Sequence, residues 1–285
     1  MSIQIQSIKA TREAVNQRRP GIQAFAVAPN LHMQGKGVVV MGNSPALKEV
    51  DLSVLDKVVT IGINRVGEIY DPSALLFTDA PIYYVAKDYY DAFKGPIFTW
   101  HGIQPDIGCL RNPEVRYFNL QPVASKPGGW RWPTAIADPL IREGTTPPYA
   151  IQLAVLSGAK AVGILGVDHS APDRRKRGQD THFFGTASGS WHCKDCSTWL
   201  ESKSVVRRNR ALICPECRSE GNLMRLSSTG GHHWTDTHKA FFNGCQAWAQ
   251  SRGTLLYNLS PYVDTPIHRA GWPKMTCEEF ADTYA

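Results

Sequence analysis

Four cysteines in one short segment have the spacing of a metal site. Cys193 and Cys196 form one Cys-x-x-Cys motif, and Cys214 and Cys217 form a second one further along the chain. Each motif presents two thiolates from a tight turn, and two such turns that face each other close a tetrahedral four-thiolate zinc site. The spacing is typical of a zinc ribbon. Because protein fills all four positions, we expect a structural Zn²⁺ and not a catalytic one.

The charge of this segment bears on what a ribbon could bind. Residues 190–228 contain seven Lys or Arg and four Asp or Glu, and four thiolates with one Zn²⁺ add a further −2, which leaves about +1. Only the basic cluster 207–210, with sequence Arg-Arg-Asn-Arg, could grip phosphates, and Trp191 or Trp199 could stack a base. Three roles are therefore possible for the ribbon. It could recognise an acceptor, contact another protein or simply stabilise the fold.

Several small and polar residues lie where a short apolar run ends. In a doubly wound parallel sheet, ligands bind outside the carboxyl ends of the strands, near the point where the strand order reverses. Gly42 would let the chain turn close to a ligand, and Ser44 would cap a following helix whose amide groups attract phosphate. The glycine-rich dinucleotide fingerprint is absent. We expect a nucleotide site that includes Gly42, Asn43, Ser44, Asn64, Asp79, Gly166 and Asp168.

Histidines in two later segments are candidates for acid–base chemistry. His232 and His233 stand beside two glycines, and an imidazole on such a loop can reach a substrate hydroxyl and has a pKa suited to taking its proton. His182 follows the cationic run 174–177, which could close over a pyrophosphate. We expect His232 to be the general base, with His233 and His182 as the reserve candidates.

The elements that would position these residues follow from the pattern of apolar runs. Short runs rich in Val and Ile alternate with helix-length segments. This pattern predicts an α/β fold with a Rossmann-like, mostly parallel sheet and helices on both faces. The seven runs are 38–41, 58–63, 74–77, 96–100, 115–118, 161–166 and 254–259.

Two helices are signalled clearly. The first follows Thr145 and Thr146, which offer an N-cap hydroxyl before two prolines, and it ends at Gly158. The second is predicted over 236–251, where an apolar face recurs at helical spacing. That face consists of Phe241, Phe242, Cys245, Trp248 and Ala249.

Length and composition indicate one large domain with an insertion. The chain has 285 residues, of which 42% are hydrophobic and 20% charged, and its net charge is +6. We expect an N-terminal extension at 1–35, a nucleotide-binding body at 36–187 and 229–285, and the ribbon at 188–228. No apolar run approaches the roughly 18 residues that span a bilayer, and the start lacks a signal peptide, so we expect a cytoplasmic protein. Cys109, Cys245 and Cys277 are expected to be small buried residues.

Parts of the sequence resemble a known superfamily. The stretch VVVMGNSPALKEVDLSVLDK is similar to the opening of the bacterial CMP-sialic-acid-dependent sialyltransferases. GTTPPYAIQLAVLSGAKAVGILGVDHS and HHWTDTHKAFFNGCQAWAQSRGTLLYNLSP resemble two further segments of that family. DTHFFG resembles a segment of the motility-associated glycosyltransferase and 6-hydroxymethylpterin diphosphokinase-like family. Together these segments cover about half the chain, and the ribbon belongs to neither family.

The resemblance implies roles for individual residues. Asn43, Asn64, Thr145 and Gly166 match positions that hold the phosphate, ribose or base of a nucleotide, and His232 matches the general base. We include the adjacent Thr146 in the site. The chain departs from the pattern where Ser44 replaces a glycine and where Pro147 stands in place of a glycine near the phosphate.

These observations favour a glycosyltransferase. It would move a glycosyl unit from a nucleotide-activated donor to a hydroxyl acceptor, which the ribbon and the basic loops suggest is a modified nucleic acid. One alternative is an ATP-dependent diphosphokinase that acts on a small hydroxymethyl compound, for which Asp79 and Asp168 would hold Mg²⁺. Another alternative is a zinc-ribbon adaptor that binds nucleic acid and has no enzymatic activity.

Overall fold

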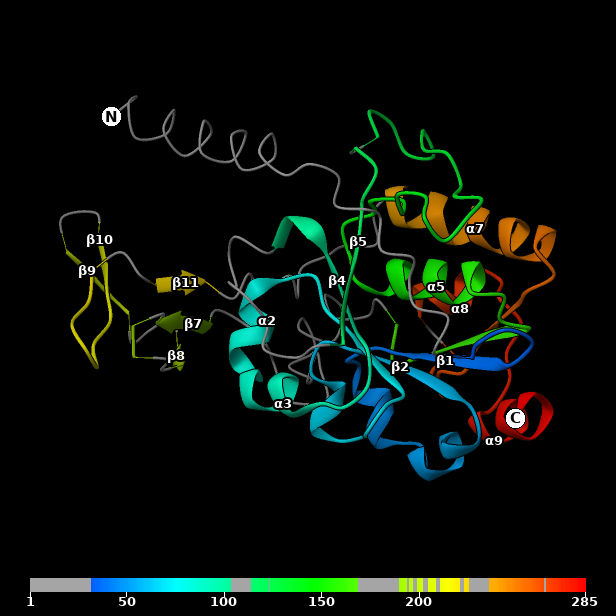
Figure 1. Ribbon diagram of the computed structural model, residues 1–285, viewed down its shortest axis with the longest axis horizontal. Coiled ribbons are helices and arrows are strands. Elements are labelled where there is room, and N and C mark those ends of the chain that lie inside the picture. Colours follow the sequence, from blue (N-terminus) through cyan, green and yellow to red (C-terminus); the bar gives the residue numbers. More distant parts are fainter. Residues whose placement is uncertain are drawn as a thin grey trace.

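A computed structural model describes most of the chain (Figure 1). The described residues are 32–103, 114–122, 124–168, 190–193, 195–196, 199–201, 205–208, 211–220, 223–225, 236–263 and 265–285. Most of the expected N-terminal extension therefore lies outside them. Met33 is buried in the main core, so the body begins slightly before the expected boundary at residue 36.

Seven parallel strands form the central sheet, as the sequence predicts. The strand order is β12-β6-β1-β2-β3-β4-β5, and every pairing is parallel. Each strand coincides with one of the seven apolar runs to within one residue. The bounds are β1 Gly37–Met41, β2 Val59–Ile63, β3 Ala74–Leu76, β4 Ile97–Trp100, β5 Val115–Phe118, β6 Ala161–Leu165 and β12 Leu255–Asn258.

The strand order reverses between β1 and β6. From β1 the chain proceeds to β2, β3, β4 and β5 on one side, and it then returns to β6 and β12 on the other side. Met41 of β1 pairs with Gly62 of β2 and with Leu165 of β6, so the carboxyl ends of these three strands are level. In open parallel sheets, ligands commonly bind where loops leave adjacent strands in opposite directions, which makes this edge the place to look for a site.

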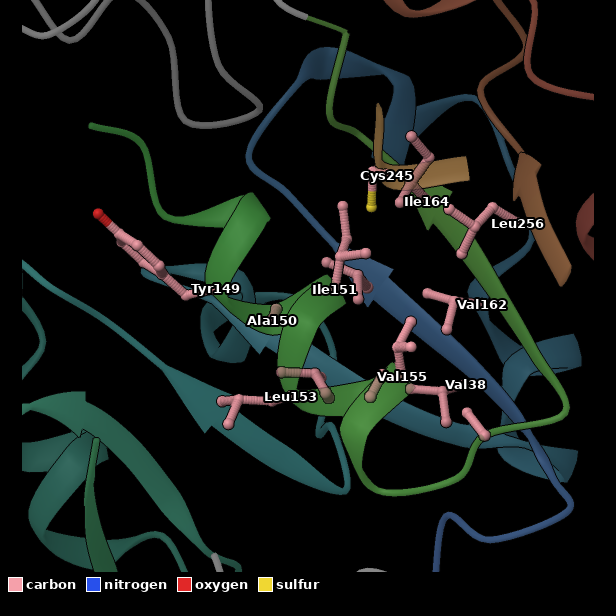
Figure 2. Close-up of a cluster of buried hydrophobic side chains, with 14 of the residues drawn as sticks. Val38, Tyr149, Ala150, Ile151, Leu153, Val155, Val162, Ile164, Cys245 and Leu256 are labelled. Atoms are coloured by element: carbon pink, nitrogen blue, oxygen red, sulfur yellow. The ribbon is translucent and has the colours of Figure 1, made fainter. Parts of the chain in front are cut away.

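Helices cover both faces of the sheet, which completes the expected α/β architecture. Side chains of successive strand residues point to opposite faces. Val38 and Val40 pack with α5 (Pro147–Leu156), α7 (Asp236–Ser251) and α8 (Pro266–Arg269). Figure 2 shows Ile151 and Val155 of α5 directed at the sheet residues Val38 and Val162.

The opposite face packs against shorter elements. Val39 and Met41 contact α9 (Cys277–Tyr284) and the 3-10 helices η2 (Pro45–Lys48) and η3 (Leu52–Lys57). Further along the sheet, Leu75 and Phe77 pack with α2 (Ala80–Val85) and α3 (Lys87–Ala92). Two more 3-10 turns, η4 (Val66–Glu68) and η5 (His101–Ile103), follow β2 and β4.

Both predicted helices form, and the second has the expected bounds. α7 spans Asp236–Ser251, and its five predicted apolar residues are buried. α5 follows Thr146 and ends before Gly158, whose φ of +78° is the left-handed conformation that commonly terminates helices. However, the side chain of Thr146 makes no capping hydrogen bond. The hydroxyl of Thr146 instead forms a hydrogen bond with the hydroxyl of Thr78.

The segment after β1 differs from the expectation. Ser44 does act as an N-cap, because its hydroxyl accepts a hydrogen bond of 3.2 Å from the amide of Ala46. The helix that it caps is only the four-residue 3-10 turn η2, since Pro45 and the polar run behind it lead directly into η3. An anion-binding helix N-terminus therefore does not form here.

The inserted segment has its own antiparallel strands. β7 (Ser190–Cys193) lies between β8 (Trp199–Glu201) and β11 (Leu223–Arg225), and β9 (Val206–Arg208) pairs with β10 (Ala211–Ile213). Arg207 and Arg208 of the basic cluster belong to β9, whereas residues 209 and 210 lie outside the described residues. β7 lies beside α2 at one end of the body (Figure 1).

Two remaining features concern membranes and free cysteines. Within the described ranges, none of the helices has the length and apolar character needed to cross a membrane. Cys245 and Cys277 are buried, as the sequence predicts, whereas Cys109 lies outside the described residues.

Candidate functional site

The four predicted metal ligands come together in one cluster. The Sγ atoms of Cys193, Cys196, Cys214 and Cys217 all lie within 4.8 Å of one another. Cys193 Sγ is 3.5 Å from Cys217 Sγ, and Cys196 Sγ is 3.7 Å from Cys214 Sγ. A tetrahedral zinc ion with Zn–S bonds of about 2.3 Å requires sulfur–sulfur distances of about 3.8 Å. The cluster therefore fits a tetrahedral metal ion such as zinc.

Local backbone geometry builds the second of these turns. The amide of Cys214 donates to the carbonyl of Ser219, and the amide of Arg218 donates to the carbonyl of Cys214. Arg218 has a φ of +60°, so the chain reverses sharply after Cys217. The hydroxyl of Ser219 lies 3.3 Å from both Cys193 Sγ and Cys217 Sγ, close enough to orient the two thiolates. Trp191 packs against this cluster.

At the carboxyl edge of the sheet, two predicted asparagines occupy matching positions. Met41 pairs with Gly62, so Asn43 and Asn64 both lie two residues beyond that pair. The side-chain Oδ1 atoms of Asn43 and Asn64 are buried and accept no hydrogen bond from the described part of the chain. Asn64 has a φ of +56°, and its carbonyl accepts a hydrogen bond of 2.6 Å from the hydroxyl of Tyr90. A buried amide oxygen without a partner is costly, which indicates a place for a ligand donor.

Gly42 and Gly166 have a different role from the one predicted. A Cβ atom on Gly42 would lie 2.2 Å from the carbonyl oxygen of Gly166, so the glycine allows the ends of β1 and β6 to approach each other. The amide of Gly42 donates to Leu165, and the amide of Ser44 donates to Gly166. Gly42 is therefore required for strand packing at the switch point, and its amide is not available to a phosphate.

Ser44 and Asp168 connect the two loops at the switch point. Both residues are buried, and the hydroxyl of Ser44 donates a hydrogen bond to Asp168 Oδ2. Asp79 lies instead after β3, on the exposed surface at the start of α2. β6 and β3 are separated by β1 and β2, and three strand spacings amount to about 14 Å. Asp79 and Asp168 are thus too far apart to bind the same Mg²⁺ ion directly.

The two threonines before α5 form hydrogen bonds within the protein. Thr145 Oγ1 donates to Glu143 Oε2 at 2.7 Å, and the Thr145 amide points to the same oxygen at 3.3 Å. The hydroxyls of Thr146 and Thr78 share a hydrogen bond of 2.9 Å, which ties the start of α5 to the end of β3. The carbonyl of Thr78 accepts a hydrogen bond of 3.0 Å from Trp100 Nε1. These contacts place the threonines at the same edge of the sheet as the asparagines.

Glu143 and His238 form a buried pair that the sequence analysis missed. His238 Nε2 lies 3.1 Å from Glu143 Oε1, and both side chains are almost completely buried. Burial raises the pKa of Glu143 to about 8, and the hydrogen bonds from Thr145 oppose this rise. No hydrogen bond joins His238 Nε2 and Glu143 Oε1, and the imidazole lies against the carboxyl group and helps to exclude water from it. Glu143 comes from the loop before α5, and His238 comes from the first turns of α7.

A signal for His238 is present in the sequence. His238, Phe241, Phe242 and Cys245 follow the i, i+3, i+4, i+7 spacing of the buried face of α7. A histidine in such a row must find a polar partner in the interior. Glu143, by contrast, lies in an irregular loop distant in sequence from His238, and no local pattern identifies it as buried.

The three predicted catalytic histidines cannot be placed in the site. His182, His232 and His233 lie outside the described residues, and so does the cationic run 174–177. Two tyrosines in and after β12, Tyr257 and Tyr262, have partners within the protein. Tyr257 hydrogen-bonds to Tyr284, and Tyr262 donates to Glu49.

No protein-family model matches the chain, and neither a curated protein nor a solved structure matches it. The resemblance to the sialyltransferases and to the motility-associated family therefore stays a prediction.

Proposed function

We propose that the protein is a transferase that moves a glycosyl unit from a nucleotide-activated donor to a hydroxyl acceptor. The observation that carries this proposal is the pair of buried amide oxygens of Asn43 and Asn64, beside the switch point of a parallel sheet, for which the described residues provide no hydrogen-bond donor. Amide oxygens only accept hydrogen bonds. The donor groups of a nucleoside are its ribose hydroxyls and the amino and ring N–H groups of its base, so these two oxygens suit the nucleoside part of the donor.

The groups that bind the phosphates of the donor must come from other residues. The amides of Gly42, Ser44 and Ala46 already donate to protein atoms. The run Arg174-Arg175-Lys176-Arg177 follows Asp168 by only six residues in the sequence, and four consecutive cations are well suited to a pyrophosphate. In our proposal this run binds the phosphates while the strand ends bind the nucleoside.

The acceptor hydroxyl needs a base, and we assign this role to His232. α7 begins at Asp236, and two residues later His238 lies beside Glu143 at the carboxyl edge. Four residues span at most about 14 Å, so the chain that leads into α7 can bring an imidazole to the edge of the sheet. His232 would take the proton of the acceptor hydroxyl as the bond between the sugar and the nucleotide phosphate breaks.

A nucleic acid that carries a hydroxyl group is the acceptor that we propose. The metal-binding ribbon lies beside α2, which starts from Asp79 at the same edge of the sheet (Figure 1). In this arrangement the ribbon, with Zn²⁺ as its structural ion, flanks the acceptor side of the site. The separation of Asp79 from Asp168 does not favour the ATP-dependent diphosphokinase, which needs carboxylates gathered on Mg²⁺. If Mg²⁺ accompanies the donor, the phosphates and a single carboxylate must hold it.

Nucleotide binding tests this proposal directly. Thermal unfolding with CMP, UDP, GDP and ATP should show specific stabilisation by one of the first three. Asn43→Ala and Asn64→Gly should each weaken that nucleotide threefold to tenfold, since one hydrogen bond is lost; glycine suits the positive φ of Asn64. Asn243→Ala, on the exposed face of α7, is the matched control. Stabilisation by none of these nucleotides would refute the proposal.

Turnover separates glycosyl transfer from its rivals. With the CMP- or UDP-activated sugar that matches the bound nucleotide, His232→Ala should lower the release of nucleotide at least a hundredfold. A diphosphokinase would instead lose activity in Asp79→Asn and Asp168→Asn and keep it in His232→Ala. An adaptor without activity would retain binding to nucleic acid in all of these variants.

A further inference from the structure

The hydroxyl of Thr145 is oriented by a neighbouring side chain. A threonine hydroxyl has one proton to donate and two lone pairs that accept. Thr145 Oγ1 directs its proton to Glu143 Oε2 at 2.7 Å, and the Thr145 amide is directed at the same oxygen. Both hydrogen-bond donors of Thr145 are thus occupied within the protein. Only the lone pairs of the hydroxyl are left for a ligand.

The start of α5 lacks the other donors that a phosphate would need. A helix N-terminus binds anions through the free amides of its first turn. The first two residues of α5 are Pro147 and Pro148, which have no N–H group, and the amide of Tyr149 donates to the carbonyl of Thr146. This helix end therefore offers an anion no donor at its first three positions.

Glu143 is enclosed on its opposite side. His238 Nε2 lies 3.1 Å from Glu143 Oε1, although no hydrogen bond joins these two atoms, and both side chains are buried. The loop next to Glu143 is nevertheless open to a ligand. Thr145 is half-buried, Gly144 is exposed, and a Cβ atom placed on Gly144 would meet nothing within 4 Å. A rigid acceptor thus borders an open space at the carboxyl edge.

We propose that Glu143, enclosed by His238, fixes the Thr145 hydroxyl as a hydrogen-bond acceptor that reads a hydroxyl or amino group of the nucleoside and not a phosphate oxygen. This inference rests on the proposed function, because it assigns a part of the nucleotide to one residue of the same site. Thr145 determines specificity by touching the ligand, and Glu143 and His238 are positioning residues.

Other charged and titratable groups lie near Glu143. Arg142 is exposed and lies over the ring of Trp100, at 5.4 Å from its centre. Tyr149 of α5 faces Glu143, and its pKa is raised to about 12, chiefly by burial. Asp79 also acts on Tyr149. The carboxyl group of Glu143 itself lies against His238 and Thr145.

Binding of a nucleoside and of its nucleotide to Thr145→Val tests the proposal. Valine keeps the shape of threonine and removes the hydroxyl. We expect the variant to bind the stabilising nucleotide at least fivefold more weakly than wild type, and the loss for the corresponding nucleoside should be equal within a factor of two. Thr145→Ser should restore both affinities, and Lys239→Ala, on the exposed side of α7, should change neither.

Two results would overturn this assignment. A loss seen with the nucleotide and not with the nucleoside would show that Thr145 reads phosphate, and unchanged affinity for both would show that it reads neither part. If wild type binds no nucleotide, it is the proposed function that fails.

A measurement without ligand tests the positioning pair. The hydrogen bonds from Thr145 lower the pKa of Glu143 against the effect of burial. In wild type, the melting temperature should fall as the pH rises through the pKa of Glu143. In Thr145→Val this fall should occur at a higher pH, and Thr145→Ser should follow the wild-type curve. Glu143→Gln, which cannot titrate, should lack that fall altogether. Superposition of the Thr145→Val and wild-type curves would show that the hydroxyl does not bond to the carboxyl group, and the proposal would be wrong.

Discussion

The parallel-sheet body and the inserted ribbon are stabilised by different means. In the body, strand residues pack on helices in three extensive apolar clusters. Among the described residues of the ribbon, the apolar cluster contains two buried residues, Cys193 and Cys214, with Trp191, Val205 and Leu223 partly buried around them. A segment of about forty residues rarely buries enough apolar surface to fold by itself. We therefore expect a metal ion on the four cysteines to take the place of the core that the body builds from side chains.

The difference also separates the two kinds of chemistry. In the ribbon, the polar residues that matter are metal ligands, and their spacing is visible in the sequence. In the body, the polar residues of the site come from separate strands and loops, and the sheet brings them to one edge. We therefore expect that the ribbon can unfold while the body stays folded, and that the body can be destabilised while the ribbon keeps its metal. The following predictions test this independence, beginning with the largest effect.

Removal of the metal should abolish the folded ribbon. Structural zinc in small modules contributes roughly 10 to 16 kcal/mol of apparent binding free energy, which is also folding free energy. A strong chelator, or Cys214→Ser, should release one metal ion per chain, as measured by atomic absorption. Limited proteolysis should then cleave within 190–225 while the body remains intact. Loss of the main thermal transition together with the metal would contradict the independence of the two regions.

A cavity in the body should have the reverse effect. Phe280 of α9 is completely buried, and its ring lies 5.0 Å from that of Tyr284. Phe280→Ala should lower the free energy of unfolding by about 3 to 5 kcal/mol, as measured by urea denaturation. The metal content should stay at the wild-type value. Release of the metal in this variant would mean that the ribbon depends on the body.

The Glu143–His238 pair should make the stability of the body depend on pH. Burial raises the pKa of Glu143 from 4.5 to about 8, so the folded protein keeps a proton that the unfolded carboxyl group has lost. The stability that this proton contributes is therefore present at lower pH and is lost as the pH rises toward 8. The loss over the upper part of this range, between about pH 6.5 and 8, amounts to about 2 kcal/mol.

Denaturation curves at several pH values measure this effect. Glu143→Gln should flatten the pH dependence across this window, because its amide does not titrate. Glu279→Gln, at an exposed position on α9, should leave the wild-type slope unchanged. A wild-type stability that rises from pH 6.5 to pH 8 would show that the buried carboxyl group is ionised throughout.

The smallest effect is expected at the cap of α9. The hydroxyl of Thr276 accepts from the amide of Glu279, and Glu279 Oε2 accepts from the amide of Thr276. Thr276→Ala should cost about 1 kcal/mol of unfolding free energy, and Thr276→Ser should restore it. Because α9 packs on the sheet and not on the ribbon, the rate of metal release should be the same in both variants.

Elements with strong local patterns could be predicted from the sequence. All seven strands of the sheet coincide with the predicted short apolar runs to within one residue, and α7 has its predicted bounds because its apolar face recurs at helical spacing. The four cysteines form a cluster because two short motifs specify it. α9 was missed although its capping box, Thr276 followed by Glu279, is readable in the sequence.

Features that depend on distant contacts could not be predicted. The role of Gly42 is set by its approach to Gly166, which lies on a strand far along the chain. Thr146 was expected to cap α5, and instead it bonds to Thr78 on β3. Glu143 acquires its raised pKa only where His238 and the surrounding core exclude water. Such residues are determined by the assembled fold and not by the segments around them.

The place of the insertion has a consequence for how the protein could diversify. The chain leaves the described part of the body after Asp168, shortly beyond the end of β6, and re-enters it at Asp236, where α7 begins. No strand of the central sheet comes from the intervening stretch among the residues described. A different module could be spliced between these two points, or the stretch shortened to a linker, without altering the hydrophobic layers. The hydrophobic layers of the body thus place few constraints on the sequence between these two points.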